Sequence, residues 1–225
     1  MNIGGKTVAI NGAARADGGG RIDVLINYAG VMPVGHYFEQ SEQAIRTAVE
    51  VNLCGVLPGC RLVLPEMVDR RSGHIVNIAS LAGAVPVPGQ VVYAGTKFAV
   101  VGMSTAMADE FAPHGVHVSV VMPPFTATDL IAGTRTPLGS KAVAPAEIAA
   151  AVLKVLEKPK TLVVVPYPMR FMAPLMSMLG PRGRRWLNGK VGSDRVFLDF
   201  DADARRAYQE RAETATGMLA PADTE

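Results

Sequence analysis

Residues 75–101 read IVNIASLAGAVPVPGQVVYAGTKFAVV, and this stretch decides the fold. It opens as an apolar run typical of a buried strand, passes Ser80 and a loop rich in glycine and proline, and then takes on the composition of a helix. Tyr93 and Lys97 lie four residues apart in that helix, so their side chains share one face. The stretch therefore predicts a strand, a loop and a helix that bring three polar side chains together.

These three side chains suit proton transfer. A free tyrosine has a pKa of about 10 and is a poor base near neutral pH, but an adjacent cation favours its phenolate and lowers that pKa. We therefore expect Lys97 to lower the pKa of Tyr93, and Ser80 to hold a substrate oxygen beside the phenol. A Tyr-x-x-x-Lys pair alone is weak, because it occurs in many helices. Its position after a strand that ends in Ser80 gives it weight.

The composition is that of one α/β domain. A chain of 225 residues can bury a substantial core without disulfides, and Cys54 and Cys60, six apart in one predicted helix, are not expected to bridge. With no Cys-x-x-Cys pattern and no N-terminal signal, we expect a cytoplasmic protein. The net charge of +2 is too small to argue for a nucleic-acid partner. No apolar run reaches the roughly 18 residues of a membrane span, so no transmembrane segment is expected.

Strands and helices alternate along the chain. Apolar runs predict buried strands at residues 6–10, 22–26, 74–79, 116–122 and 161–165, and helical periodicity marks residues 41–69, 90–111 and 145–157. Ser41 is the expected N-cap of the first of these helices, and Pro58 should kink or break it. This alternation predicts an α/β fold with a mostly parallel sheet, in which ligands bind outside the carboxyl ends of the strands.

A glycine-rich turn, NGAARADGGG at residues 11–20, follows the first predicted strand. Such a turn lets backbone N–H groups approach a pyrophosphate, usually at the start of a helix. No amphipathic helix follows here, so a flexible linker remains the alternative. A second loop, PPFTAT at residues 123–128, leaves the carboxyl end of a later strand and would lie near Ser80.

Metal and acyl-transfer chemistry find little support. His114 and His117 are three apart, but Gly115 and the end of the helix between them remove the register that would aim both at one metal, so no metal site is predicted. The chain also lacks the Gly-x-Ser-x-Gly pattern of α/β serine hydrolases.

The C-terminal part divides into two. Residues 168–198, rich in methionine at their start, suggest a substrate-side or interface segment within a single domain of residues 1–212. The basic residues beside Trp186 could contact anionic lipid heads, so peripheral membrane contact is one interpretation, although a solvated basic corner is the simpler one. Residues 213–225 are expected to form a flexible tail.

Over residues 6–165 the chain resembles the short-chain dehydrogenase/reductase family. Residues 27–30, NYAG, resemble that family's Asn-Asn-Ala-Gly, with Tyr28 in place of the second asparagine. Ser80, Tyr93 and Lys97 match its catalytic serine, tyrosine and lysine in order and spacing. Residues 123–128 resemble its Pro-Gly-x-x-x-Thr segment, with Pro124 where glycine is usual. The combination is far more specific than any one motif.

The resemblance implies a Rossmann-type three-layer sandwich that uses NAD or NADP to transfer hydride between nicotinamide and an apolar alcohol or ketone, and that forms a homodimer or homotetramer. Tyr93 would be the general acid/base, Lys97 would also bind the nicotinamide ribose, Ser80 would orient the substrate oxygen, and Asn52 would hold a water in a proton relay. For Asn52 a satisfied core amide is the alternative. The implied cofactor-binding residues are Gly12, Ala14, Arg15, Gly18, Asn27, Ala29, Gly30, Tyr93, Lys97, Pro123, Thr126 and Thr128.

The main departure from the family is an absence on the adenosine side. The first helix, and the second and third strands with their helices, have no counterpart between residues 11 and 22. A short connection there leaves one face of the first strands and a strand edge uncovered. Either the sequence lacks a segment that the protein carries, which the intact reactive set favours, or the deletion is genuine. In the second case the chain is a degenerate, non-catalytic relative that acts through binding or assembly.

Overall fold

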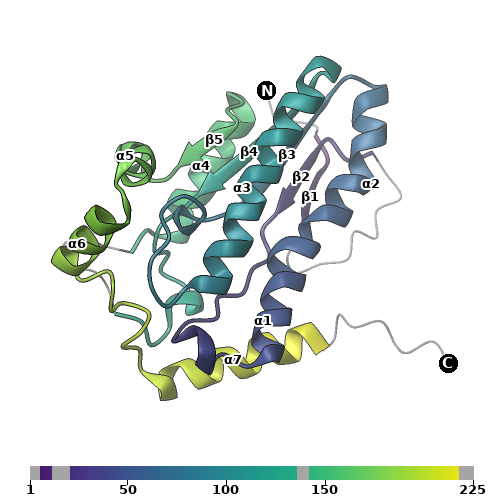
Figure 1. The fold of residues 1–225 in the computed structure, drawn as a ribbon. Coiled ribbons are helices and arrows are strands. Elements are labelled where there is room, and N and C mark those ends of the chain that lie inside the picture. The colour runs from purple at the N-terminus through teal and green to yellow at the C-terminus, as the bar shows by residue number, and fades with distance from the viewer. Residues whose placement is uncertain (1–5, 12–20, 136–141, 218–225) are drawn as a thin grey trace.

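The computed structural model describes residues 6–11, 21–135 and 142–217, and it is an α/β fold with one parallel sheet (Figure 1). The strand order is β1-β2-β3-β4-β5, and every neighbouring pair is parallel. The strands are β1 Val8–Asn11, β2 Val24–Asn27, β3 Gly73–Ile78, β4 Val116–Met122 and β5 Leu162–Val164. The helices are α1 Glu42–Val49, α2 Val56–Asp69, α3 Val91–Phe111, α4 Pro145–Glu157, α5 Met172–Met178, α6 Pro181–Val191 and α7 Ala202–Gly217. The predicted fold class is confirmed, and each predicted strand and helix is present with small shifts at its ends.

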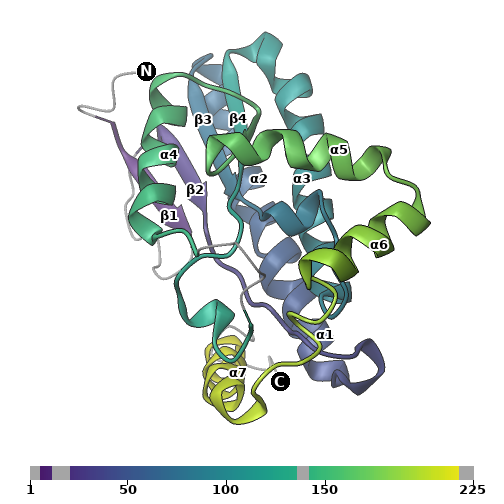
Figure 2. The same cartoon turned by 90° about the vertical axis from the view of Figure 1, so that its left-hand side faces the viewer.

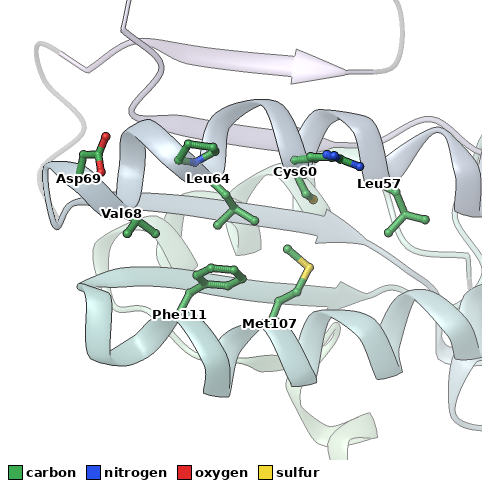
Figure 3. Close-up of a pocket in the computed structure, with 9 residues that line it drawn as sticks. Leu57, Cys60, Leu64, Val68, Asp69, Met107 and Phe111 are labelled. Atoms are coloured by element: carbon green, nitrogen blue, oxygen red, sulfur yellow. The ribbon is translucent and has the colours of Figure 1, made fainter.

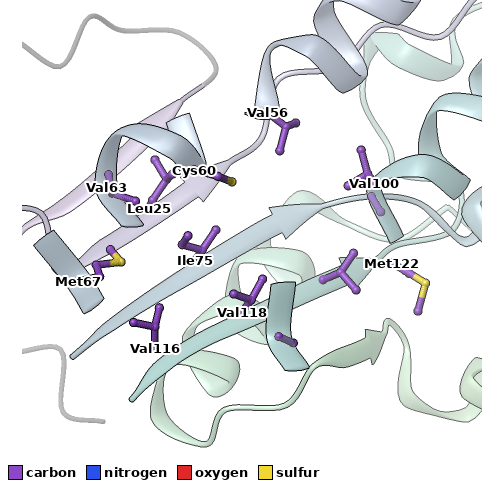
Figure 4. Close-up of a cluster of buried hydrophobic side chains, with 13 residues drawn as sticks. Leu25, Val56, Cys60, Val63, Met67, Ile75, Val100, Val116, Val118 and Met122 are labelled. Carbon is purple, nitrogen blue, oxygen red and sulfur yellow. The ribbon is translucent and has the colours of Figure 1, made fainter. Parts of the chain in front are cut away.

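The main core lies between the sheet and the helices α2 and α3. Leu25, Ile75 and Val118 project from three adjacent strands and meet Met67 of α2 and Val100 of α3 (Figure 4). Because parallel strands are covered on both faces, their sequences read as continuous apolar runs, and all six residues of β3 are buried. The strand that leads to Ser80 is therefore buried at the centre of the sheet.

The first long helix is interrupted. Ser41 caps it as predicted, since its hydroxyl oxygen accepts a hydrogen bond from the Ala44 N–H at 3.1 Å. A π-helical turn, Glu50–Cys54, then separates α1 from α2, and the Gly55 N–H donates to the Glu50 carbonyl at 2.7 Å. Pro58 has no N–H to donate to the carbonyl four residues before it, so the irregular turn lies just N-terminal to it. The predicted break is present.

The open side of β1 was also predicted. Val8 and Ile10 lie on the α4 side of the sheet and are 41% and 58% exposed, and among the described residues β1 has a neighbouring strand on one side only. Helix α4 packs on that face against residues of the next strands, including Val76 and Val121 (Figure 2). The uncovered face and edge therefore lie at the end of the sheet where the family's additional units are missing.

Two expectations concern the long helices. Cys54 and Cys60 are free, as expected. The expectation that no run is long enough for a membrane span was wrong, because residues 42–69, counted across the π-helical turn, and residues 91–114 meet that test by length and composition. Of the most apolar part of each stretch, 33% is buried inside the protein for residues 42–69 and 44% for residues 91–114, where the helices pack against the sheet. Core helices of this kind meet the same test as membrane helices.

The C-terminal helix is longer than expected. Helix α7 continues to Gly217, five residues into the segment that was expected to be a flexible tail. Alanine, glutamate and arginine dominate its sequence and favour helix, and the Thr214 hydroxyl donates to the Glu210 carbonyl at 2.8 Å. The last eight residues lie outside the described part of the chain.

Candidate active site

The three predicted catalytic side chains gather beyond the carboxyl end of β3. Ser80 lies two residues after the last residue of β3, Ile78, and caps the short 3-10 helix Leu81–Gly83, because its hydroxyl oxygen accepts from the Ala82 N–H at 3.1 Å. The Leu81 N–H donates to the Pro123 carbonyl at 2.8 Å. This bond ties the loop after β3 to the loop after β4, so both predicted site loops lie side by side.

Tyr93 and Lys97 project from the first turns of α3 and are buried. The Lys97 Nζ lies 5.7 Å from the centroid of the Tyr93 ring and donates to the Ile78 carbonyl at 3.1 Å. Ser80 is close enough to Tyr93 for a side-chain hydrogen bond that lowers the pKa of the phenol. The serine, the phenol and the ammonium thus form one buried group.

The pKa shifts differ from the sequence expectation. Burial raises the pKa of Tyr93 to about 12, and the charge of Tyr208 adds to this, while the hydrogen bond from Ser80 opposes it. Burial lowers the pKa of Lys97 to about 8. The expected lowering of the Tyr93 pKa was wrong for this state of the protein, because burial is the largest cause of the shift and raises the pKa.

Asn52 lies in the π-helical turn and is fully buried. Its Oδ1 accepts from the Val31 N–H at 2.8 Å, and its Nδ2 donates to the Val31 carbonyl at 2.8 Å and to the Thr96 hydroxyl at 3.0 Å. The side chain is therefore a satisfied core amide, the alternative given above. It fixes the segment after β2 against α3, and the water relay remains a prediction.

Gly30 lies between Lys97 and Asn52. A Cβ at this position would lie 3.3 Å from the Lys97 Nζ and 3.4 Å from the Asn52 Oδ1, tighter than most such contacts. Glycine therefore lets the backbone after β2 approach Lys97 closely. Together with Ala29, it lies in the predicted cofactor-binding segment beyond the carboxyl end of β2.

Asn27 has a different place from the one predicted. Its Nδ2 donates to the Asn77 Oδ1 at 2.8 Å and to the Cys60 Sγ at 3.4 Å, inside the core. The Asn77 Nδ2 in turn donates to the Ser104 hydroxyl at 2.9 Å. This buried network joins β2, β3, α2 and α3, so the side chain of Asn27 supports the sheet instead of facing a cofactor. The polar Asn77 inside an apolar strand was the sequence signal for it.

The remaining predicted cofactor residues fall in two groups. Pro123, Thr126 and Thr128 lie in the loop after β4, and the Thr128 hydroxyl oxygen accepts from the Leu130 N–H at 3.4 Å, which caps the 3-10 helix Asp129–Ile131. The Thr126 hydroxyl donates to the Pro124 carbonyl at 3.3 Å. Four predicted residues of the glycine-rich turn lie outside the described residues: Gly12, Ala14, Arg15 and Gly18.

An apolar cluster surrounds Tyr93. Met32 belongs to it, together with Phe125, whose ring stacks on that of Phe197 at a centroid distance of 5.4 Å. Phe197 is one of several residues in the cluster that sequence reasoning missed, because they come from a segment about 100 residues after Tyr93. The apolar positions Val196, Phe197 and Phe200 were the available signal.

Helix α7 is fastened next to this cluster. The fully buried guanidinium of Arg205 donates to the carbonyls of Leu130, at 2.6 Å, and Ala132, at 3.2 Å, and to that of Met32. The Met32 N–H donates to the Tyr208 hydroxyl at 3.0 Å. Sequence reasoning missed both residues, since an arginine in a polar helix is usually solvated.

The comparisons with known proteins agree with this geometry. The family model described as short chain dehydrogenase matches residues 6–138. An uncharacterized oxidoreductase of Staphylococcus saprophyticus is 42% identical over 49% of this chain and 46% of its own length. The 3-ketodihydrosphingosine reductase of Dictyostelium discoideum is 32% identical over 72% of this chain and 52% of its own. The chain thus spans about half the length of such relatives.

Solved structures show the same fold. A short-chain dehydrogenase from Sphingobium yanoikuyae in complex with NADPH matches with a TM-score of 0.62 at 27% identity, over 71% of this chain and 66% of that one. A 3-oxoacyl-[acyl-carrier protein] reductase with bound NAD from Brucella melitensis matches with a TM-score of 0.56 at 29% identity, over 65% and 62%. Sequence match, sheet topology and the grouping of Ser80, Tyr93 and Lys97 lead to one conclusion: the chain belongs to the short-chain dehydrogenase family.

Proposed function

We propose that the protein is an NAD(P)-dependent oxidoreductase that acts on the CH–OH or C=O group of an apolar alcohol or ketone. The observation that carries this proposal is the buried group of Ser80, Tyr93 and Lys97 at the carboxyl ends of β3 and β4. Membership of the short-chain dehydrogenase family and solved relatives with NAD or NADPH support the choice of cofactor.

The shifted pKa of Tyr93 fits the role of an acid. With a pKa of about 12, the phenol carries its proton at neutral pH and can donate it to a developing alkoxide. Ser80 would hold that oxygen in place, and the ammonium of Lys97, with a pKa of about 8, is mostly charged at neutral pH and would stabilise the phenolate that remains. In the reverse direction Tyr93 would accept the proton from the alcohol. The nicotinamide, when bound, supplies or accepts the hydride.

The described residues fit the nicotinamide half of the cofactor. Gly30 leaves no Cβ in the space beside Lys97, and Thr128 and Pro123 lie in the neighbouring loop. These residues would hold the nicotinamide and its ribose. The adenosine half would lie toward β1, where the described residues supply no further strand or helix.

A second candidate function follows from that end of the sheet. The exposed Val8 and Ile10 and the single pairing of β1 are what a relative without a complete nucleotide site would show. Such a chain would act through binding or assembly. The two functions differ in one property, which is the affinity for nicotinamide dinucleotides.

Titration of the full chain with NADH and with NADPH, followed by cofactor fluorescence, separates them. We expect saturable binding of at least one cofactor by the wild type, and about tenfold weaker binding by Lys97→Met, because a charge-assisted hydrogen bond is lost. Lys154→Met, at an exposed position on α4, is the matched control and should bind like the wild type. Absence of saturable binding of both cofactors would reject the enzyme and support the non-catalytic relative.

We also propose that the protein is a homo-oligomer that pairs through α2 and α3. An open apolar groove of about 450 Å³ runs between these helices and is lined by Leu57, Leu64, Val68, Met107 and Phe111 among others (Figure 3). Light scattering should then give a mass of at least twice 23.7 kDa, and the monomer mass would contradict pairing.

A further inference from the structure

Positive charge is concentrated in residues 167–193. This segment contains five basic side chains and no acidic one, while the rest of the chain carries 17 basic and 20 acidic side chains. None of the five forms an ion pair with a described carboxylate. The guanidinium of Arg170 instead lies over the rings of Tyr167, at 3.7 Å, and Phe171, at 4.4 Å. Residues 167–193 are therefore a local cluster of positive charge.

Helix α6 presents this charge as one stripe. Arg182, Arg185, Trp186 and Lys190 are exposed and recur at helical spacing, so they share a face, and Trp186 is 65% exposed. On the opposite side Leu187 packs into an apolar cluster with Leu81. That packing fixes the orientation of the helix, with its indole and three cations facing outward.

Helix α5, which precedes α6 in the chain, adds exposed apolar side chains. Met176 is buried against Leu81 and Val85, whereas Leu175 and Met178 are 59% and 84% exposed. Phe171, at the start of the helix, is exposed as well. The α5–α6 pair stands to one side of the sheet and its covering helices in Figure 1, and it lies toward the viewer in Figure 2, which looks from that side. Large apolar side chains thus extend away from the body of the protein.

We propose that the α5–α6 face, defined by Phe171, Leu175, Met178, Arg182, Arg185, Trp186 and Lys190, binds the surface of an anionic membrane. A lipid surface offers uniform negative charge above an apolar layer, which complements a face where cations and exposed apolar side chains predominate. Asp194 brings one carboxylate beside α6, since its Oδ2 lies 3.8 Å from the position that a Cβ on Gly189 would occupy. Tryptophan is favoured at the boundary between these layers because its ring is apolar and its N–H is polar. A protein partner would more often present charges of both signs.

The face lies close to the loop that carries Ser80. Met176 and Leu187 of the two helices belong to the same apolar cluster as Leu81, the residue that follows Ser80. A protein bound through this face would hold that loop near the lipid. The proposal itself concerns binding and does not depend on turnover.

Co-sedimentation of the full chain with vesicles tests the proposal. Vesicles of phosphatidylcholine with 30% phosphatidylglycerol are compared with pure phosphatidylcholine at low and physiological salt. We expect binding to the anionic vesicles only, and loss of about a hundredfold in affinity for the variant Arg182→Gln/Arg185→Gln/Lys190→Gln, at about 1 kcal/mol for each basic residue near an anionic surface. Trp186 is the only tryptophan in the chain, so its fluorescence should shift to shorter wavelength on binding.

The matched control is Arg46→Gln/Arg195→Gln/Arg206→Gln. These three arginines lie on other elements, are mostly exposed and form surface ion pairs, and their replacement changes the net charge by the same amount. The control should bind within about threefold of the wild type, because its three arginines lie outside the α5–α6 face. It should also fold like the wild type, because exposed ion pairs contribute little to stability. Circular dichroism checks that both triple variants are folded. Equal binding by the two variants, an unshifted Trp186 emission, or no sedimentation with anionic vesicles at low salt would overturn the proposal.

Discussion

At the scale of single residues, burial acts on Tyr93 and Lys97 in opposite directions. Both side chains lie in the interior, where the charged form of either group is disfavoured, so the phenol keeps its proton and the ammonium loses its own more easily. The sequence could predict the proximity of these two groups, because positions four apart in a helix share a face. It could not predict the shifts, which depend on segments such as the one that carries Tyr208.

The lowered pKa of Lys97 predicts a pH dependence of stability. Its pKa is about 8 in the folded protein and 10.5 ordinarily, so between these values the folded state has lost a proton that the unfolded chain still binds. The free energy of unfolding should therefore rise with pH in that window, by at most about 1.4 kcal/mol per pH unit. Below pH 8 both states are protonated and Lys97 adds no slope.

Urea unfolding of the wild type and Lys97→Met at pH 7.5, 8.5 and 9.5 measures this contribution. The difference between the two should grow in favour of the wild type as the pH rises, because methionine carries no proton. Lys154→Met, at an exposed position, should run parallel to the wild type. Parallel curves for Lys97→Met as well would contradict the lowered pKa. The raised pKa of Tyr93 affects stability only above about pH 10, outside the measured range.

At the scale of elements, the sequence predicted what depends on local pattern. Two elements have in the structure the bounds that the sequence predicts, the strand over residues 116–122 and the helix over residues 145–157. An apolar run marks the strand, and a proline in the first turn marks the start of the helix. The role of α7 could not be predicted in this way. Its packing depends on Arg205 meeting three carbonyls that are more than 70 residues away in the sequence.

Arg205 should be the main anchor of α7. In Arg205→Ala the carbonyls of Leu130, Ala132 and Met32 lose their buried donor, and the free energy of unfolding should fall by about 2–4 kcal/mol. Arg206→Ala is the neighbouring control, since Arg206 is exposed and pairs only with Asp203 at the surface; it should change the value by less than about 0.5 kcal/mol. Urea unfolding compares the two, and equal losses would show that Arg205 does not anchor the helix.

At the scale of the whole molecule, the chain is a short-chain dehydrogenase fold with an open end. The missing units could be predicted from the sequence, since too few residues lie between the first two strands to form them, and Val8 and Ile10 are exposed as that absence requires. The packing of residues 196–200 near Tyr93 could not, because it depends on a contact between Phe197 and Phe125 across the fold. Local pattern thus predicted the grouping of Ser80, Tyr93 and Lys97 better than the apolar cluster around Tyr93.

The most direct test of the central claim is turnover by the full chain and by Tyr93→Phe. NADPH and NADH oxidation is followed with a panel of apolar ketones such as 2-octanone, and Tyr28→Phe, which removes an exposed hydroxyl, is the control. If Tyr93 transfers the proton, the wild type and Tyr28→Phe turn over, whereas Tyr93→Phe loses about 10²–10⁴-fold in rate with its fold intact. Undiminished activity of Tyr93→Phe, or no activity of the wild type with either cofactor, would contradict it.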